Sequence, residues 1–94
     1  MVTKKAESCM KNLARLMKKQ AGDCWKRTKK GNKAKIGCWE LDCNSVYGGC
    51  VIEEMVNEGG GVSTPFGSMR RKPTSFCETI NFAIRALEYK KRRR

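Results

Sequence analysis

Hydrophobic positions recur with helical spacing near the start of this chain. From residue 6 onward they return at steps of three and four, and the stripe consists of Ala6, Cys9, Met10, Leu13, Leu16 and Met17. This spacing predicts an amphipathic helix over residues 4–20. We expect the helix to stop at Ala21-Gly22-Asp23, because glycine commonly ends helices.

A second helical stripe lies near the other end, and it consists of Phe76, Ile80, Ala83 and Leu87, widened by Cys77 and Ile84. It predicts a helix over residues 75–89. Ser75 and Glu78 have the spacing of a capping box and Pro73 precedes them, so we expect this helix to begin at Ser75. Phe82 lies off the stripe and either contacts a second element or is exposed.

Between the two helical stripes the pattern shortens to alternation. Residues 36–43 alternate apolar and acidic side chains, which is typical of a half-buried strand. Residues 50–57 predict a second strand, joined to the first by a turn in an antiparallel hairpin, with a bulge or strand end at Glu53-Glu54. Residues 59–61 are all glycine and predict a turn. Residues 62–66 predict a short edge strand, because Pro65 cannot donate a ladder hydrogen bond.

These elements predict an α+β fold in a single domain over residues 1–94. We expect a small antiparallel sheet of two to three strands with the N-terminal and the C-terminal helix packed on one face, in the order α-β-β-β-α. Residues 26–35 hold six basic side chains and no large apolar one, so we expect an exposed basic loop there. Residues 90–94 are expected to form a basic tail, and Trp25 to pack in the core.

Charge is sorted into blocks along the chain. Residues 1–35 hold twelve Lys or Arg against two acids, residues 36–69 hold none against five acids, and residues 70–94 hold nine against two. The net charge is +12. Positive charge used only for solubility is usually interspersed with acids. Two basic flanks therefore indicate a polyanionic partner, although a solvated surface without a partner remains an alternative.

The first functional hypothesis is a small, basic, non-enzymatic protein that grips the backbone phosphates of DNA or RNA. The candidate binding residues are Lys26, Arg27, Lys29, Lys30, Lys33, Lys35, Arg70, Arg71 and Lys72, with Lys11, Arg15 and Lys18 as a second stripe. The hypothesis depends on the two basic flanks folding beside each other into one continuous surface.

The element order is similar to that of double-stranded-RNA-binding domains, in which a basic cluster opens the last helix and grips phosphates. Gly67-Ser68 followed by Arg70-Arg71-Lys72 carries this similarity, but Pro73 and the capping box interrupt it, so we assign no family. The second hypothesis is a viral or phage inhibitor or adaptor, for example of the anti-CRISPR kind. It would bind a host protein that handles nucleic acid, through its basic surface or through the acidic centre with Tyr47 and Met55.

The six cysteines allow three interpretations. No apolar run at the start is long enough for a signal peptide, and none elsewhere could span a membrane, which predicts a reducing, intracellular, cytoplasmic location. In such a compartment we expect the cysteines to be small buried apolar side chains, with disulfides as an alternative. Zinc would need four thiolates, because the chain has no histidine, and it has no C-x2-C pair.

Catalytic chemistry finds little support in this sequence. Glu40 and Asp42, with Glu53 or Glu54 opposite, could hold Mg²⁺, but no catalytic lysine or histidine lies near them. The glycines at 59–61 lack the Lys-Ser/Thr of a P-loop. We therefore expect a non-enzyme without cofactor or metal. The edge strand at residues 62–66 would also permit a homodimer.

Overall fold

The part of the chain that the structure describes folds into two helices and five short strands. The computed structural model describes residues 4–92, and the side chains of residues 4–90. In chain order the elements are α1 (Lys4–Leu16), β1 (Trp25–Thr28), β2 (Gly31–Ala34), β3 (Trp39–Asn44), a 3₁₀ turn η1 (Ser45–Tyr47), β4 (Gly49–Met55), β5 (Val62–Ser63) and α2 (Pro73–Arg92). The predicted α+β class is confirmed, with two strands more than expected.

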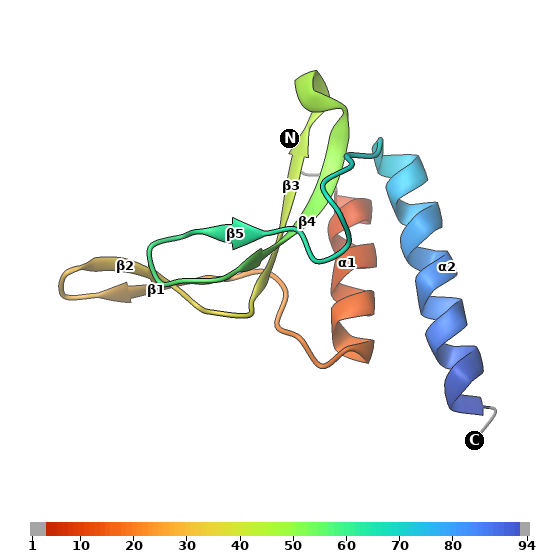
Figure 1. The fold of residues 1–94 in the computed structure, drawn as a ribbon, viewed down its shortest axis with the longest axis horizontal. Coiled ribbons are helices and arrows are strands. Elements are labelled where there is room, and N and C mark those ends of the chain that lie inside the picture. Colours follow the sequence, from red (N-terminus) through yellow and green to blue (C-terminus); the bar gives the residue numbers. More distant parts are fainter. Residues whose placement is uncertain (1–3, 93–94) are drawn as a thin grey trace.

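The main sheet has the order β3-β4-β5 and is antiparallel throughout. The alternation predicted for the first strand is confirmed, since Trp39, Leu41 and Cys43 are buried while Glu40 and Asp42 are partly exposed. Both helices lie on the side of the sheet to which these apolar residues point (Figure 1). The core therefore lies between one sheet face and the two helices, as predicted.

Neither the bulge nor the strand end expected at Glu53-Glu54 is present, since β4 continues to Met55. The pairing runs without interruption, with Glu53 opposite Glu40 and Glu54 opposite Trp39. Glu54 can stay in register on the core side of the sheet, because its carboxylate accepts a hydrogen bond from the Trp39 indole Nε1 at 2.9 Å. It also pairs with Lys19 Nζ at 3.3 Å. A polar group so satisfied does not force the strand out of the sheet.

The boundaries of both helices differ from those predicted. α1 ends at Leu16, because Lys18 adopts a left-handed φ of 57°. The Lys19 N–H bonds Ala14 O at 2.8 Å and the Lys18 N–H bonds Arg15 O at 3.3 Å, which is a Schellman motif with lysine in the usual glycine position. α2 begins at Pro73, so the predicted capping box at Ser75 is wrong. Proline is favoured as the first helical residue, because its N–H would be unpaired there anyway.

Residues 26–35 are not a loop, contrary to expectation. β1 and β2 pair as an antiparallel hairpin, whose strands are held by backbone hydrogen bonds that need no apolar side chain. At its base, Cys24, Ala34, Cys38 and Met55 form a second small core. Trp25 was predicted to pack in the core, but it is 42% exposed. Its ring lies over Gly60, where a Cβ would be 2.7 Å from Cη2.

Four of the six cysteines are paired in disulfides, which corrects the expectation that all would be thiols. Cys24 is bonded to Cys38, and Cys43 to Cys50, its cross-strand neighbour. Cys9 and Cys77 are buried thiols, as expected. The two bridges argue against the reducing compartment that we predicted. Among the described helices, none has the length and apolarity to cross a membrane.

Candidate nucleic-acid interface

Six of the twelve candidate residues lie on one projection of the molecule. We call residues 25–35 the basic hairpin. It extends away from the helices, so that its tip and α2 lie at opposite ends of the longest axis (Figure 1). Its cations are Lys26, Arg27, Lys29, Lys30, Lys33 and Lys35. All are exposed except Lys35, which is half-buried.

The register of the hairpin places like charges opposite each other. Lys26 is the direct cross-strand partner of Lys33, so both side chains leave the same face. Lys29 and Lys30 occupy the turn, which the Thr28 hydroxyl closes by donating to Gly31 O at 2.6 Å. Lysines directly opposite each other repel, and this costs the hairpin stability.

Among the described residues, acidic side chains do little to offset the repulsion between the hairpin lysines. The carboxylate of Glu58 lies 3.9 Å from Lys33 Nζ, and the two side chains are 62% and 51% exposed. An exposed pair of this length contributes little. The remaining hairpin cations have no ion pair among residues 4–90.

A shallow groove runs along the lysine face of the hairpin. Its volume is about 350 Å³, and its lining consists of Lys26, Thr28, Lys33, Ala34, Lys35, Ile36 and Glu58. Three ammonium groups and one hydroxyl can thus approach an anion placed in it, against one carboxylate. The hydroxyl and the exposed Ile36 side chain were not among the residues predicted from charge.

The Cys24–Cys38 bridge closes the base of the hairpin. Its Cα atoms are 5.6 Å apart, and the loop between the two cysteines contains every cation of the hairpin. Backbone bonds support the same base, since Ala34 N–H donates to Glu58 O at 2.9 Å and Lys35 N–H to Cys24 O at 2.7 Å. The projection is therefore anchored at its root.

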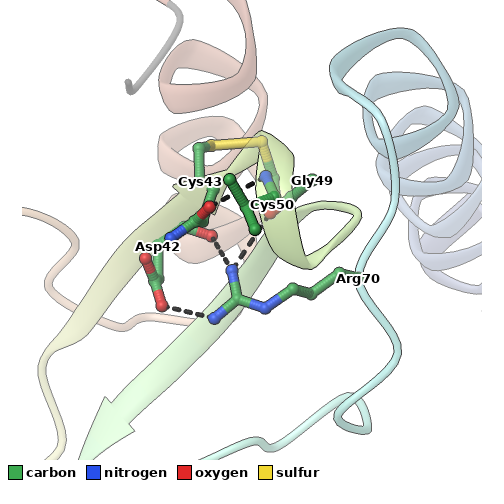
Figure 2. A network of polar contacts seen from close by, with 7 residues as sticks. Asp42, Cys43, Gly49, Cys50 and Arg70 are labelled. Carbon is green, nitrogen blue, oxygen red and sulfur yellow. Dashed lines mark hydrogen bonds and ion pairs between the residues drawn. A yellow bond between two sulfur atoms is a disulfide. The ribbon is translucent and has the colours of Figure 1, made fainter.

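Arg70, which we predicted as a phosphate ligand, is engaged within the protein. Its side chain reaches from the segment before α2 to the β3–β4 hairpin (Figure 2). Nη2 bonds Asp42 Oδ2 at 2.6 Å, and Nη1 donates to Gly49 O at 3.0 Å and to Asp42 O at 3.3 Å. The guanidinium also lies 5.9 Å from the centre of the Tyr47 ring. These contacts engage both Nη atoms of the guanidinium and hold the side chain against the protein.

The two neighbours of Arg70 in sequence are less constrained. Arg71 pairs through its backbone with Cys50, with N···O distances of 2.6 and 3.0 Å, while its side chain is exposed. Lys72 is exposed immediately before α2. They are the last two residues before α2, whose start lies away from the basic hairpin (Figure 1). The expected single surface is therefore not formed, because the basic hairpin lies apart from α2, although α1 of the first basic flank packs against α2. The nucleic-acid hypothesis now depends on the hairpin alone.

The second candidate stripe lies on α1. Lys11, Arg15 and Lys18 are exposed, and Lys11 Nζ pairs with the Glu7 carboxylate at 3.3 Å, one helical turn away. Arg15 is in the last turn of α1, and Lys18 is in the Schellman motif that follows it. The stripe thus belongs to the helical layer and not to the projecting hairpin.

Three of the four acidic side chains in β3 and β4 lie on the sheet face opposite the helices. Glu40 and Asp42 share that face as predicted, and Glu53 is directly across from Glu40. Burial raises the pKa of the Glu53 carboxyl, and Asp42 and Glu40 raise it further, whereas Arg70 lowers it. No group of three or more potential ligands suited to a metal ion occurs in the described part of the chain. Met55 is buried, so it cannot contribute to a docking surface here.

The pKa of the Glu54 carboxyl is lowered, in contrast to that of Glu53. The hydrogen bond from the Trp39 indole lowers the pKa of its carboxyl, burial works against this, and Lys19 lowers the pKa further. The carboxylate therefore stays ionised and stabilises the end of the main sheet.

Comparison with known proteins gives no assignment. No family model, no curated protein and no solved structure matches this chain. The interpretation of the basic hairpin therefore depends on its own geometry and charge.

Proposed function

We propose that this protein binds the phosphate backbone of a nucleic acid through the basic hairpin, without catalysing a reaction. The observation that carries the proposal is the cross-strand pair of Lys26 and Lys33 on a projecting ribbon. Such a pair is unfavourable by itself, and a polyanion laid across it converts the repulsion into attraction.

The shape of the projection also supports the proposal. A two-stranded β-ribbon fits the major groove of B-DNA, and the turn lysines would lead it. Contacts to phosphates position a protein without reading sequence. We therefore expect binding that is strongly salt-dependent and almost indifferent to sequence. Arg71 and Lys72 would contact phosphates only on a ligand long enough to pass around the molecule.

The test is a fluorescence-anisotropy titration of the full chain against labelled duplex DNA, duplex RNA and single-stranded DNA. Between 50 and 300 mM salt, each phosphate neutralised on B-DNA contributes roughly −0.9 to the slope of log K against log salt. If the hairpin makes four to six such contacts, the slope is about −4 to −5. Absence of binding at low salt would reject the proposal.

Two charge-matched variants locate the surface. Lys26→Gln/Lys33→Gln removes two charges from the hairpin face, and Arg85→Gln/Lys90→Gln removes two exposed charges from α2. We expect the hairpin variant to reduce the slope by about 2, and the α2 variant to leave it nearly unchanged. The hairpin variant should also be slightly more stable, since a like-charge pair is gone, so lost binding would not reflect unfolding. Equal effects of both variants would contradict binding through the hairpin.

The alternative function is binding to a protein that handles nucleic acid. Exposed apolar side chains favour it, since Val46, Tyr47 and Met69 are 85%, 72% and 71% exposed near the start of α2. Capture of a partner from nuclease-treated lysate discriminates the two. A partner that survives nuclease treatment supports the alternative, and one that is lost supports nucleic-acid binding. Pairing of two copies along β5 stays a prediction for light scattering to check.

A further inference from the structure

The two unpaired cysteines face each other across the contact between the helices. Cys9 lies on α1 and Cys77 on α2, and both are buried in the main core. Cys77 is close enough to Cys9 to raise the pKa of the Cys9 thiol. The helices run side by side along this contact (Figure 1). The fold thus brings together two cysteines from nearly opposite ends of the sequence.

We propose that Cys9 and Cys77 form a third disulfide, which joins α1 to α2, with a small disulfide such as oxidised glutathione as the oxidant. The other four cysteines are already paired, so each of these two is the remaining partner of the other. A disulfide joins residues whose Cα atoms lie within about 7 Å of each other, and two packed helices that bury both side chains in one core can meet this requirement. This inference is independent of the proposed function.

The reaction balances as two successive thiol–disulfide exchanges. The thiolate of one cysteine attacks a sulfur of oxidised glutathione, forms a mixed disulfide and releases one glutathione thiolate. The thiolate of the second cysteine then attacks the protein sulfur of that mixed disulfide and releases the second glutathione. The two protons of the cysteine thiols end on the two glutathiones, so that two protein thiols are oxidised and one glutathione disulfide is reduced.

The surroundings of the pair determine when the bridge forms. Burial raises the pKa of the Cys9 thiol to about 11, the hydrogen bond and the charge interaction with Cys77 raise it too, and Lys5 lowers it. The reactive thiolate is therefore scarce at neutral pH, and the closed helix contact keeps glutathione out. We expect the bridge to form while the helices are still docking, and to form slowly in the folded protein.

The test is refolding of the reduced full chain in a glutathione buffer, followed by unfolding, alkylation with N-ethylmaleimide and intact-mass measurement. We expect no alkylated cysteine and a cross-linked proteolytic peptide pair that contains Cys9 and Cys77. Cys9→Ser and Cys77→Ser are the matched controls, and each should retain the other two bridges and carry one alkylated thiol. Two alkylated thiols at Cys9 and Cys77, or a stable glutathione adduct there, would overturn the proposal once the other bridges are complete.

A second measurement compares thermal unfolding of the three-bridge form with the two-bridge form of the same chain, separated by chromatography. The new bridge closes a long loop of the unfolded chain, and we expect it to raise Tm by roughly 10 °C or more. A Tm that is unchanged or lowered by the third bridge would also overturn the proposal, because it would mean that the helices must move apart to form it.

Discussion

Replacement of Arg70 by glutamine tests whether this residue has a structural role or a binding role. The substitution removes the ion pair with Asp42 and the donors to two backbone carbonyl oxygens, those of Asp42 and Gly49. It keeps a polar side chain of moderate length at the same position. Because these contacts hold the segment before α2 against the β3–β4 hairpin, we expect a loss of stability.

The magnitude follows from the contacts and their exposure. Hydrogen bonds to charged groups contribute about 1.5–3 kcal/mol each when buried. Here the arginine side chain is 21% exposed and that of Asp42 is 41% exposed, so water screens the ion pair. The third contact is long, at 3.3 Å. We therefore expect a total loss of about 1.5–2.5 kcal/mol, or roughly 10 °C in Tm for a domain of this size.

The assay is urea unfolding of the disulfide-bonded protein, with Arg70→Gln, Asp42→Asn and the double variant in one thermodynamic cycle. We expect a coupling energy of about 1 kcal/mol between the two residues. Arg70→Lys should recover only part of the loss, because an ammonium group cannot bond the carboxylate and the carbonyls together. The salt slope of nucleic-acid binding should stay as in the wild type.

The opposite pattern would refute this reasoning. If Arg70→Gln changes the unfolding free energy by less than about 0.5 kcal/mol, the side chain is not held as the structure has it. If the same variant reduces the salt slope by about 1, as expected for the loss of one phosphate contact, the guanidinium is free to contact phosphate.

Three further substitutions probe single features of the fold. Gly49→Ala should lose about 2–4 kcal/mol in thermal unfolding, because the new Cβ collides with the Arg71 backbone and φ is 124°; a loss below 1 kcal/mol contradicts the close approach. Lys18→Gly should gain about 0.5–1 kcal/mol, because glycine adopts the left-handed conformation without strain, and a net loss would argue against the Schellman motif. Glu53→Gln should gain about 0.2–1 kcal/mol at pH 7, because it removes a carboxylate that burial destabilises and that Asp42 and Glu40 repel. Since the fold raises the pKa of Glu53, wild-type stability falls as pH rises through the folded pKa, and the gain should vanish below the unfolded pKa; a gain that persists at low pH contradicts this.

Burial patterns were the predictable part of the fold. The stripes at both ends and the alternation around Leu41 are one-sided, so each element had one way to cover its apolar face. The hairpin over 25–34 was not predictable in this way. Its pairing depends on backbone hydrogen bonds, and its side chains follow no apolar period. The sequence feature that could have indicated the hairpin turn is Gly31, which directly follows Lys29 and Lys30. Its φ is 122°, a conformation that favours glycine.

The clustering of basic residues in the sequence predicted the hairpin cations of the candidate site. It did not predict that Arg70 bonds Asp42 within the protein. The aspartate that engages this arginine is 28 residues away in sequence, so only the tertiary fold brings the two together. The same holds for the cysteines. Cys24 and Cys38 meet because the hairpin returns the chain to its own base, and nothing in their spacing distinguished a bridge from two buried thiols.

Two features of the hairpin together favour a polyanionic ligand over a solvated surface without a partner. A hairpin of two strands is only marginally stable in water, and the opposed pair of Lys26 and Lys33 weakens it further. Yet its base is closed by the Cys24–Cys38 disulfide, and among residues 4–90 only Glu58 forms an ion pair with one of its lysines. Charges needed for solubility alone could be placed anywhere on the surface and interspersed with acids. A ribbon that concentrates them on a projection anchored at its base, at a cost in stability, is consistent with the phosphate-bearing ligand that we propose.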